Sequence, residues 1–152
     1  MPVNAAKPNS SSGRSRSVPS IHVSASSGVL IRYFAEDDIP RALAAAELID
    51  SGTDLVLSTG VILETIHVLR TDYGFDNPIL GDLLIRFLSR TNVNLIDADK
   101  AGVLDALSWT QNSSDRRIAD ALLSTAAEQA EVDFIATFDE KLRSPFIQVR
   151  ML

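Results

Sequence analysis

Residues 55–69 read LVLSTGVILETIHVL, and this stretch decides the fold. Its first three residues are all apolar, which is typical of a short strand buried on both faces. Ser58 or Thr59 can then cap a helix, because a hydroxyl oxygen accepts a hydrogen bond from a free backbone N–H. The apolar residues from Val61 to Leu69 predict the helix itself. The stretch therefore predicts a buried strand followed directly by a helix.

The same alternation of apolar runs and helical segments continues on both sides of this unit. The expected strands lie near residues 21–34, 93–96, 132–137 and 146–151, and the expected helices at 38–51, 77–88, 99–110 and 118–130, the last capped by Ser114 or Asp115. A short helical turn is expected at 140–142. Apolar strands separated by helices predict an α/β fold with a central, mainly parallel sheet of about five strands. Ligands of such folds bind at the carboxyl ends of the strands.

Length and composition indicate a single folded domain. The chain has 152 residues, of which 45% are hydrophobic and 22% charged, so it is long enough to bury one core. It contains no cysteine, which excludes disulfides and thiol chemistry. No apolar run reaches the roughly 18 residues that span a bilayer. Residues 1–20, rich in serine and proline, are predicted to be a flexible leader, with the domain at 21–152.

Charge is distributed unevenly along the chain. The formal net charge is −6, yet residues 1–28 carry three basic side chains and no acidic one. The remainder holds 11 basic and 20 acidic side chains, a net charge of −9. An acidic domain repels phosphate, so a nucleic-acid function would require a local basic rim or bound divalent cations.

Three acidic residues occupy positions where a carboxylate is costly or well placed for chemistry. Glu64 lies among apolar residues and is expected near the interior, Asp120 falls in the first turns of a helix, and Asp139 follows a strand. Each alone is adequately explained as a boundary residue, a first-turn acid or a cap. Together, converging carboxylates would need a hard cation such as Mg²⁺ or Mn²⁺ to offset their repulsion.

Four stretches carry a resemblance to a known family: GVLIRYFAEDD at 28–38, VILETIHVL at 61–69, IADALL at 118–123 and ATFD at 136–139. In their order and spacing they resemble a PIN domain of the VapC toxin type, over residues 28–152. The resemblance implies an α/β/α sandwich that hydrolyses RNA phosphodiester bonds with Mg²⁺ or Mn²⁺. By motif, it implies catalytic and metal-binding roles for Glu64, Asp120 and Asp139.

One residue of the family's metal site is missing. The family places an Asp at the end of the first strand, in an Asp-Thr-Asn triplet, and this chain has Ser26, Ser27 and Gly28 there. Serine is a neutral and weak metal ligand. The preceding stretch at 21–25 is also more polar than a central strand normally is. We therefore expect impaired or absent ribonuclease activity, and we hypothesise that the residues before Gly28 arose from a shifted reading frame or an altered start.

Two further kinds of function are compatible with these residues. A catalytically inactive PIN fold could bind an antitoxin-like peptide, RNA or a second copy of itself. A phosphoacceptor receiver domain also combines a parallel sheet with an acidic Mg²⁺ pocket, but it requires an acidic pair at the end of its first strand, where residues 24–28 contain none.

Partners follow from the resemblance as well. It implies an RNA substrate, an antitoxin-like protein that reaches into the acidic cleft, and a homodimer. The residues expected to contact RNA are Arg32, Arg116, Arg117, Lys141 and Arg143. The lack of cysteine and of a secretion signal makes the cytoplasm the expected location.

Overall fold

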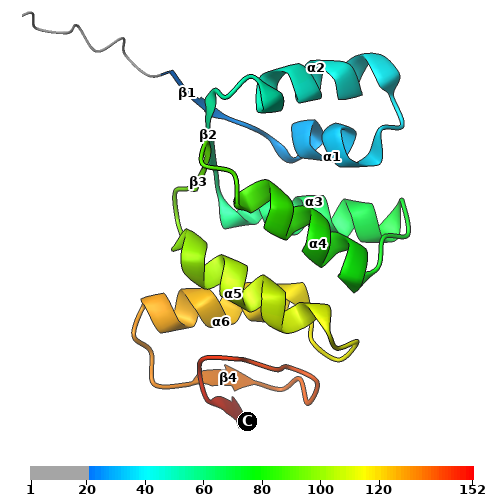
Figure 1. Ribbon diagram of the computed structural model, residues 1–152. Helices are drawn as coiled ribbons and strands as arrows, with labels where there is room; N and C mark the ends of the chain where they lie inside the picture. Colours follow the sequence, from blue (N-terminus) through cyan, green and yellow to red (C-terminus); the bar gives the residue numbers. More distant parts are fainter. Residues whose placement is uncertain (1–20) are drawn as a thin grey trace, which may run out of the picture.

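The computed structural model describes residues 21–152, so the predicted leader at 1–20 lies outside the described residues. The elements, in chain order, are β1 (His22–Ser24), α1 (Ser27–Ala35), α2 (Ile39–Asp50), β2 (Asp54–Leu57), α3 (Thr59–Thr71), α4 (Asn77–Leu88), β3 (Val93–Leu95), α5 (Lys100–Gln111), α6 (Ile118–Gln129), β4 (Ile135–Thr137) and β5 (Val149–Met151). Figure 1 shows the helices stacked from α1 and α2, through α3 and α4, to α5 and α6. The predicted α/β class with parallel strands is confirmed.

The strands form two small sheets. Strands β1, β2 and β3 pair in parallel in that order, and β4 pairs in parallel with β5 in a separate sheet. The expected sheet of about five strands is therefore divided into three and two. The polar character of β1 explains the division, because His22 and Ser24 are exposed and a strand in the middle of a parallel sheet must be apolar on both faces. Strand β1 is an edge strand, and β4 does not pair with it among the described residues.

The expected strand at residues 29–34 is wrong. These residues belong to α1, which buries Leu30 completely and packs Val29, Ile31 and Phe34 partly against the core. A short run of apolar residues is compatible with either a strand or a buried helix, so periodicity alone could not distinguish them. Glu36, in a left-handed conformation with φ 52°, ends the helix.

Polar side chains cap four helices. Asp38, Ser58, Asp76 and Asp99 each accept a hydrogen bond from a backbone N–H in the first turn of α2, α3, α4 and α5 respectively. The predicted cap at Ser58 is confirmed, and Asp38 caps the helix expected at residues 38–51. The expected cap of α6 by Ser114 or Asp115 is wrong: its N-cap is Arg117, whose side chain makes no capping bond.

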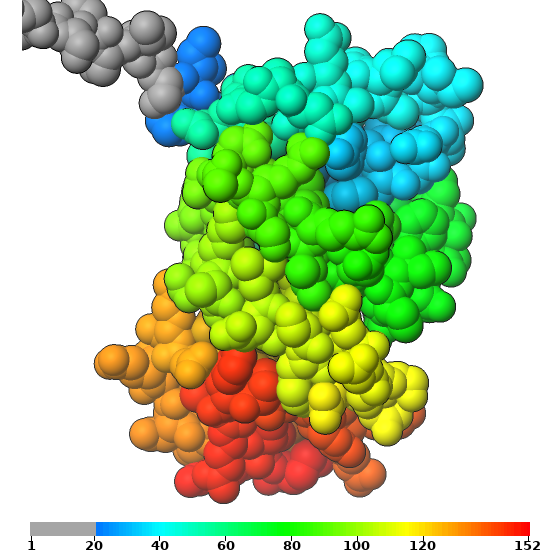
Figure 2. All heavy atoms as spheres, viewed as in Figure 1, coloured from blue at the N-terminus to red at the C-terminus, as the bar shows by residue number. Residues whose placement is uncertain are grey.

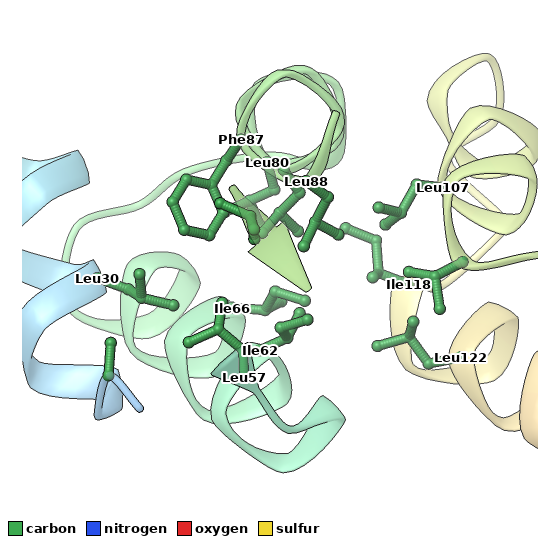
Figure 3. Packing of buried hydrophobic residues seen from close by; sticks show 14 of the residues in the cluster. Leu30, Leu57, Ile62, Ile66, Leu80, Phe87, Leu88, Leu107, Ile118 and Leu122 are labelled. Carbon is green, nitrogen blue, oxygen red and sulfur yellow. The ribbon is translucent and has the colours of Figure 1, made fainter. Parts of the chain in front are cut away.

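The core connects the stacked helices. Figure 3 shows Leu57 of β2 and Ile62 and Ile66 of α3 facing Leu80, Phe87 and Leu88 of α4, with Leu107, Ile118 and Leu122 of α5 and α6 beside them. In the space-filling view the segments succeed one another in bands, from α1 and α2 to the C-terminal strands at the opposite end (Figure 2). Among the described residues, no helix is long and apolar enough to cross a membrane.

Candidate functional site

Asp120 and Asp139 meet on one arginine. The Nε of Arg117 donates to Asp120 Oδ2 at 2.8 Å, and its Nη2 donates to Asp139 Oδ2 at 2.7 Å. Asp120 lies in the first turn of α6, three positions after Arg117, and its side chain is only 9% exposed. Asp139 follows β4 and is 44% exposed. The structure thus brings together two of the three predicted acids, with a guanidinium between them.

A tight turn holds Asp139 in place independently of Arg117. Its Oδ1 accepts a hydrogen bond from the backbone N–H of Lys141 at 2.9 Å, and its own N–H donates to Thr137 Oγ1 at 2.9 Å. The hydrogen bond from Arg117, and next the one from Lys141, lower the pKa of Asp139 below its usual value. The hydrogen bonds that Arg117 donates raise its own pKa, with Asp120 contributing more than Asp139. Both ion-paired groups are therefore charged at neutral pH.

The expected burial of Glu64 is wrong, because this residue is exposed. Helix α3 buries Ile62, Thr65, Ile66 and Leu69, which lie on one face at helical spacing. Glu64 is two positions after Ile62, about 200° around the helix, and so lies on the opposite face. The apolar residues around Glu64 indicated an interior position. The position of Glu64 relative to these residues around the helix places it on the exposed face instead.

The residues as arranged do not fit a Mg²⁺ or Mn²⁺ ion. Such ions require several oxygen ligands, and Mg²⁺ takes them in a near-octahedral arrangement. Among residues 21–152, no group of three or more acidic or histidine side chains is placed to hold a metal ion. In the pair that does converge, one oxygen of each carboxylate is already bound to Arg117.

Ser26, which the sequence resemblance predicts to be at the position of the missing first acid, lies at the junction of β1 and α1. It is the N-cap residue of α1, yet its side chain makes no capping hydrogen bond. Ser26 is exposed and lines a cavity of about 470 Å³ together with Arg32 and Arg41. The residues lining this cavity do not include Asp120 or Asp139.

The five basic residues expected to contact RNA have different surroundings. Of these five, within residues 21–152, only Arg117 forms salt bridges with the acid pair, whereas Arg116 stacks on Trp109 at 4.6 Å from the ring centroid and donates to its carbonyl at 2.8 Å. Arg143 donates to the carbonyls of two neighbouring turn residues. Lys141 is exposed and contributes its backbone N–H to Asp139.

Arg32 takes part in a separate polar network. Its Nη1 donates to both carboxylate oxygens of Asp37, at 2.7 and 2.6 Å, and the hydroxyl of Tyr73 donates to Asp37 Oδ2 at 2.5 Å. These contacts join the end of α1 to the loop after α3. The hydrogen bonds from Arg32 and then Tyr73 lower the pKa of Asp37 below its usual value of 3.8.

Replacing Asp37 by asparagine is expected to lower stability at neutral pH and to have a smaller effect in acid. Because the pKa of Asp37 is lower in the folded than in the unfolded chain, its charged contacts stabilise the fold above about pH 4 and lose that effect as the pH falls through the folded pKa. Urea unfolding of the two proteins at pH 7 and at about pH 2.5 measures the difference. A gap between them that is as large in acid as at pH 7 would contradict this assignment.

An apolar groove, which the sequence did not reveal, lies between α1, α2 and α4. It encloses about 640 Å³ and is lined by Tyr33, Phe34, Ile39, Leu43, Leu83 and Phe87. Ile39 and Leu43 are 70% and 66% exposed. Charged side chains also line this groove, including Glu36, Asp50, Arg86 and Arg90. The residues that line the groove come from helices that are far apart in the chain, so no local sequence pattern could have predicted it.

Comparisons with known proteins bear on the family. The model of the PIN domain family matches residues 27–145, which is most of the chain and includes Asp120 and Asp139. No curated protein and no solved structure matches the chain. The match begins one residue after Ser26, where the resemblance of the sequence to the family also fades. This chain belongs to the PIN domain family.

Proposed function

We propose that this chain is a PIN domain of the VapC toxin type whose endoribonuclease activity on RNA is strongly impaired. PIN domains are generally nucleases and typically depend on a divalent metal ion. The observation that carries the proposal is the contact of Arg117 with both Asp120 and Asp139. In this arrangement a side-chain cation neutralises the two carboxylates to which the resemblance assigns metal binding.

Two further features support impairment. Ser26 offers a neutral hydroxyl at the position of the family's first acid, and Glu64 is on the exposed face of α3. A nuclease site of this kind must place a water molecule in line with phosphorus, and a displacement of about 1 Å can reduce the rate on the order of 100-fold. With two of the four acidic positions unsuited to hold a metal ion, we expect a reduction in rate of about this order.

Cleavage of a panel of structured RNAs tests the proposal. We compare the unmodified chain, Asp120→Asn and Ser26→Asp in Mn²⁺, Mg²⁺ and EDTA. The unmodified chain and Asp120→Asn are expected to give the same background, unchanged by EDTA. The cleavage rate of Ser26→Asp is expected to stay at that background. In this variant Glu64 still does not join the acid pair, and Arg117 still contacts both aspartates.

Cleavage by the unmodified chain that disappears both in EDTA and in Asp120→Asn would contradict impairment. Activity restored by Ser26→Asp alone would show that a single missing ligand, and not the arrangement of the remaining acids, disables the site. Circular dichroism on each variant provides the control for folding.

The apolar groove supports a binding role as the second candidate function. Exposed Ile39 and Leu43 beside the aromatic rings of Tyr33, Phe34 and Phe87 offer an apolar surface of the kind that receives an amphipathic helix. The charged side chains that line the groove would orient the polar residues of such a helix; they are Arg86, Arg90, Glu36 and Asp50. The proposed occupant is a helix of an antitoxin-like protein, which the VapC type implies.

An RNA substrate and a chain without cysteine are consistent with a cytoplasmic protein.

A further inference from the structure

We infer that Arg117 is a built-in counter-ion that replaces a divalent cation between Asp120 and Asp139, and that removing its charge converts this pair into a cation-binding site. The inference rests on the proposed assignment of the two acids to the family's metal-binding positions. It concerns which cation neutralises them, and it can be tested without measuring RNA cleavage.

The geometry of Arg117 fits a bridging role. Its Nε and Nη2 donate to different carboxylates, at 2.8 and 2.7 Å, so a single planar group spans the gap between them. The guanidinium is charged at every accessible pH, and its donors form a fixed fork. Because Arg117 is the N-cap residue of α6 and Asp120 lies in the first turn of that helix, the start of α6 brings the two side chains near each other.

Burial gives this contact its importance. The Asp120 side chain is only 9% exposed. A buried carboxylate without a cationic partner strongly destabilises the fold. Arg117 is the only basic side chain within salt-bridge distance of Asp120 among residues 21–152. The buried charge therefore depends on this arginine for neutralisation.

The backbone of both acids is positioned independently of Arg117. The backbone of Asp120 belongs to the first turn of α6, and Asp139 is held by the N–H of Lys141 and by the bond from its own N–H to Thr137 Oγ1. Removing the guanidinium takes away the donor group that the Oδ2 atoms of both carboxylates share. Their mutual repulsion is relieved by a hard dication, for which carboxylate oxygens are preferred ligands.

Three variants isolate the charge of Arg117. Arg117→Gln removes the charge and retains a polar side chain, whereas Arg117→Lys retains the charge. Arg116→Gln is the matched control, since the neighbouring Arg116 contacts Trp109 and is in no salt bridge with a carboxylate in the described part of the chain. The double variant Arg117→Gln/Asp139→Asn removes one carboxylate of the pair.

Binding of Mn²⁺ is measured by calorimetry and by the loss of the electron paramagnetic resonance signal of free Mn²⁺. Arg117→Gln is expected to bind Mn²⁺ at least about tenfold more tightly than the unmodified chain, Arg116→Gln or Arg117→Lys. The double variant is expected to lose this gain. Mn²⁺ is also expected to raise the Tm of Arg117→Gln alone, because a ligand that binds only the folded state stabilises it.

Equal Mn²⁺ affinity of Arg117→Gln and the unmodified chain would overturn the inference, as would a gain that survives in the double variant. If Arg117→Gln is unfolded without metal, recovery of its circular dichroism spectrum on adding Mn²⁺ supports the inference, and failure to recover overturns it. Metal-dependent RNA cleavage by the unmodified chain would contradict the proposed function, whereas these binding results test the counter-ion alone.

Discussion

Replacing Leu57 by alanine is expected to lower the free energy of unfolding by about 2–5 kcal/mol, the range for a leucine removed from a well-packed core. Leu57 is fully buried at the end of β2, where its backbone pairs with β3. It lies among the residues of α3 and α4 that connect the sheet to the helices (Figure 3). Alanine would leave a cavity at this junction, which the surrounding helices can fill only in part.

Urea unfolding at 25 °C measures this loss. The matched control is Leu123→Ala, since Leu123 is 45% exposed on α6 and its truncation is expected to cost much less. A loss below about 1 kcal/mol for Leu57→Ala, or an equal loss in both variants, would contradict the position of Leu57 in the core.

Replacing Leu43 by aspartate is expected to weaken binding of an antitoxin-like partner by at least about 30-fold, which corresponds to the roughly 2 kcal/mol of an interface hot spot. Leu43 is 66% exposed and lines the apolar groove, so a carboxylate there would face the apolar side of the bound helix. Because the residue is exposed in the free chain, the substitution is not expected to affect folding.

The partner used is an antitoxin-like polypeptide, co-expressed and co-purified with this chain. Titration calorimetry compares the unmodified chain, Leu43→Asp and the control Leu123→Asp, whose exposed leucine lies on α6 outside the groove. Equal affinity of all three would exclude the groove as the binding surface. Failure of any polypeptide to co-purify would contradict an antitoxin-type partner.

Most helices could be predicted from the sequence because their signals are local. Asp38 and Ser58 identify the starts of α2 and α3, and an apolar run of three residues identifies β2. Strand and helix could not be distinguished at residues 29–34, because every position there except Arg32 is apolar or aromatic and both structures would bury them. The division of the sheet depends on pairing between distant strands, which local pattern does not specify.

The candidate site was predicted in part. Asp120 and Asp139 come together as expected, since one heads a helix and the other follows a strand. Glu64 does not join them, and the helical phase of Ile62 and Ile66 could have revealed this from the sequence. Arg117 was expected to contact RNA, and in the structure it is the N-cap residue of α6, three positions before Asp120, with which it forms an ion pair.

The most direct measurement is a crystal structure of the unmodified chain grown in Mn²⁺, with diffraction data collected where manganese scatters anomalously. We expect the Arg117 guanidinium within hydrogen-bond distance of both Asp120 and Asp139, as found here, and no anomalous peak between the carboxylates. A manganese peak bound by both aspartates, with Arg117 displaced, would contradict the assignment of Arg117 as their counter-ion and restore a metal-dependent site to this PIN domain.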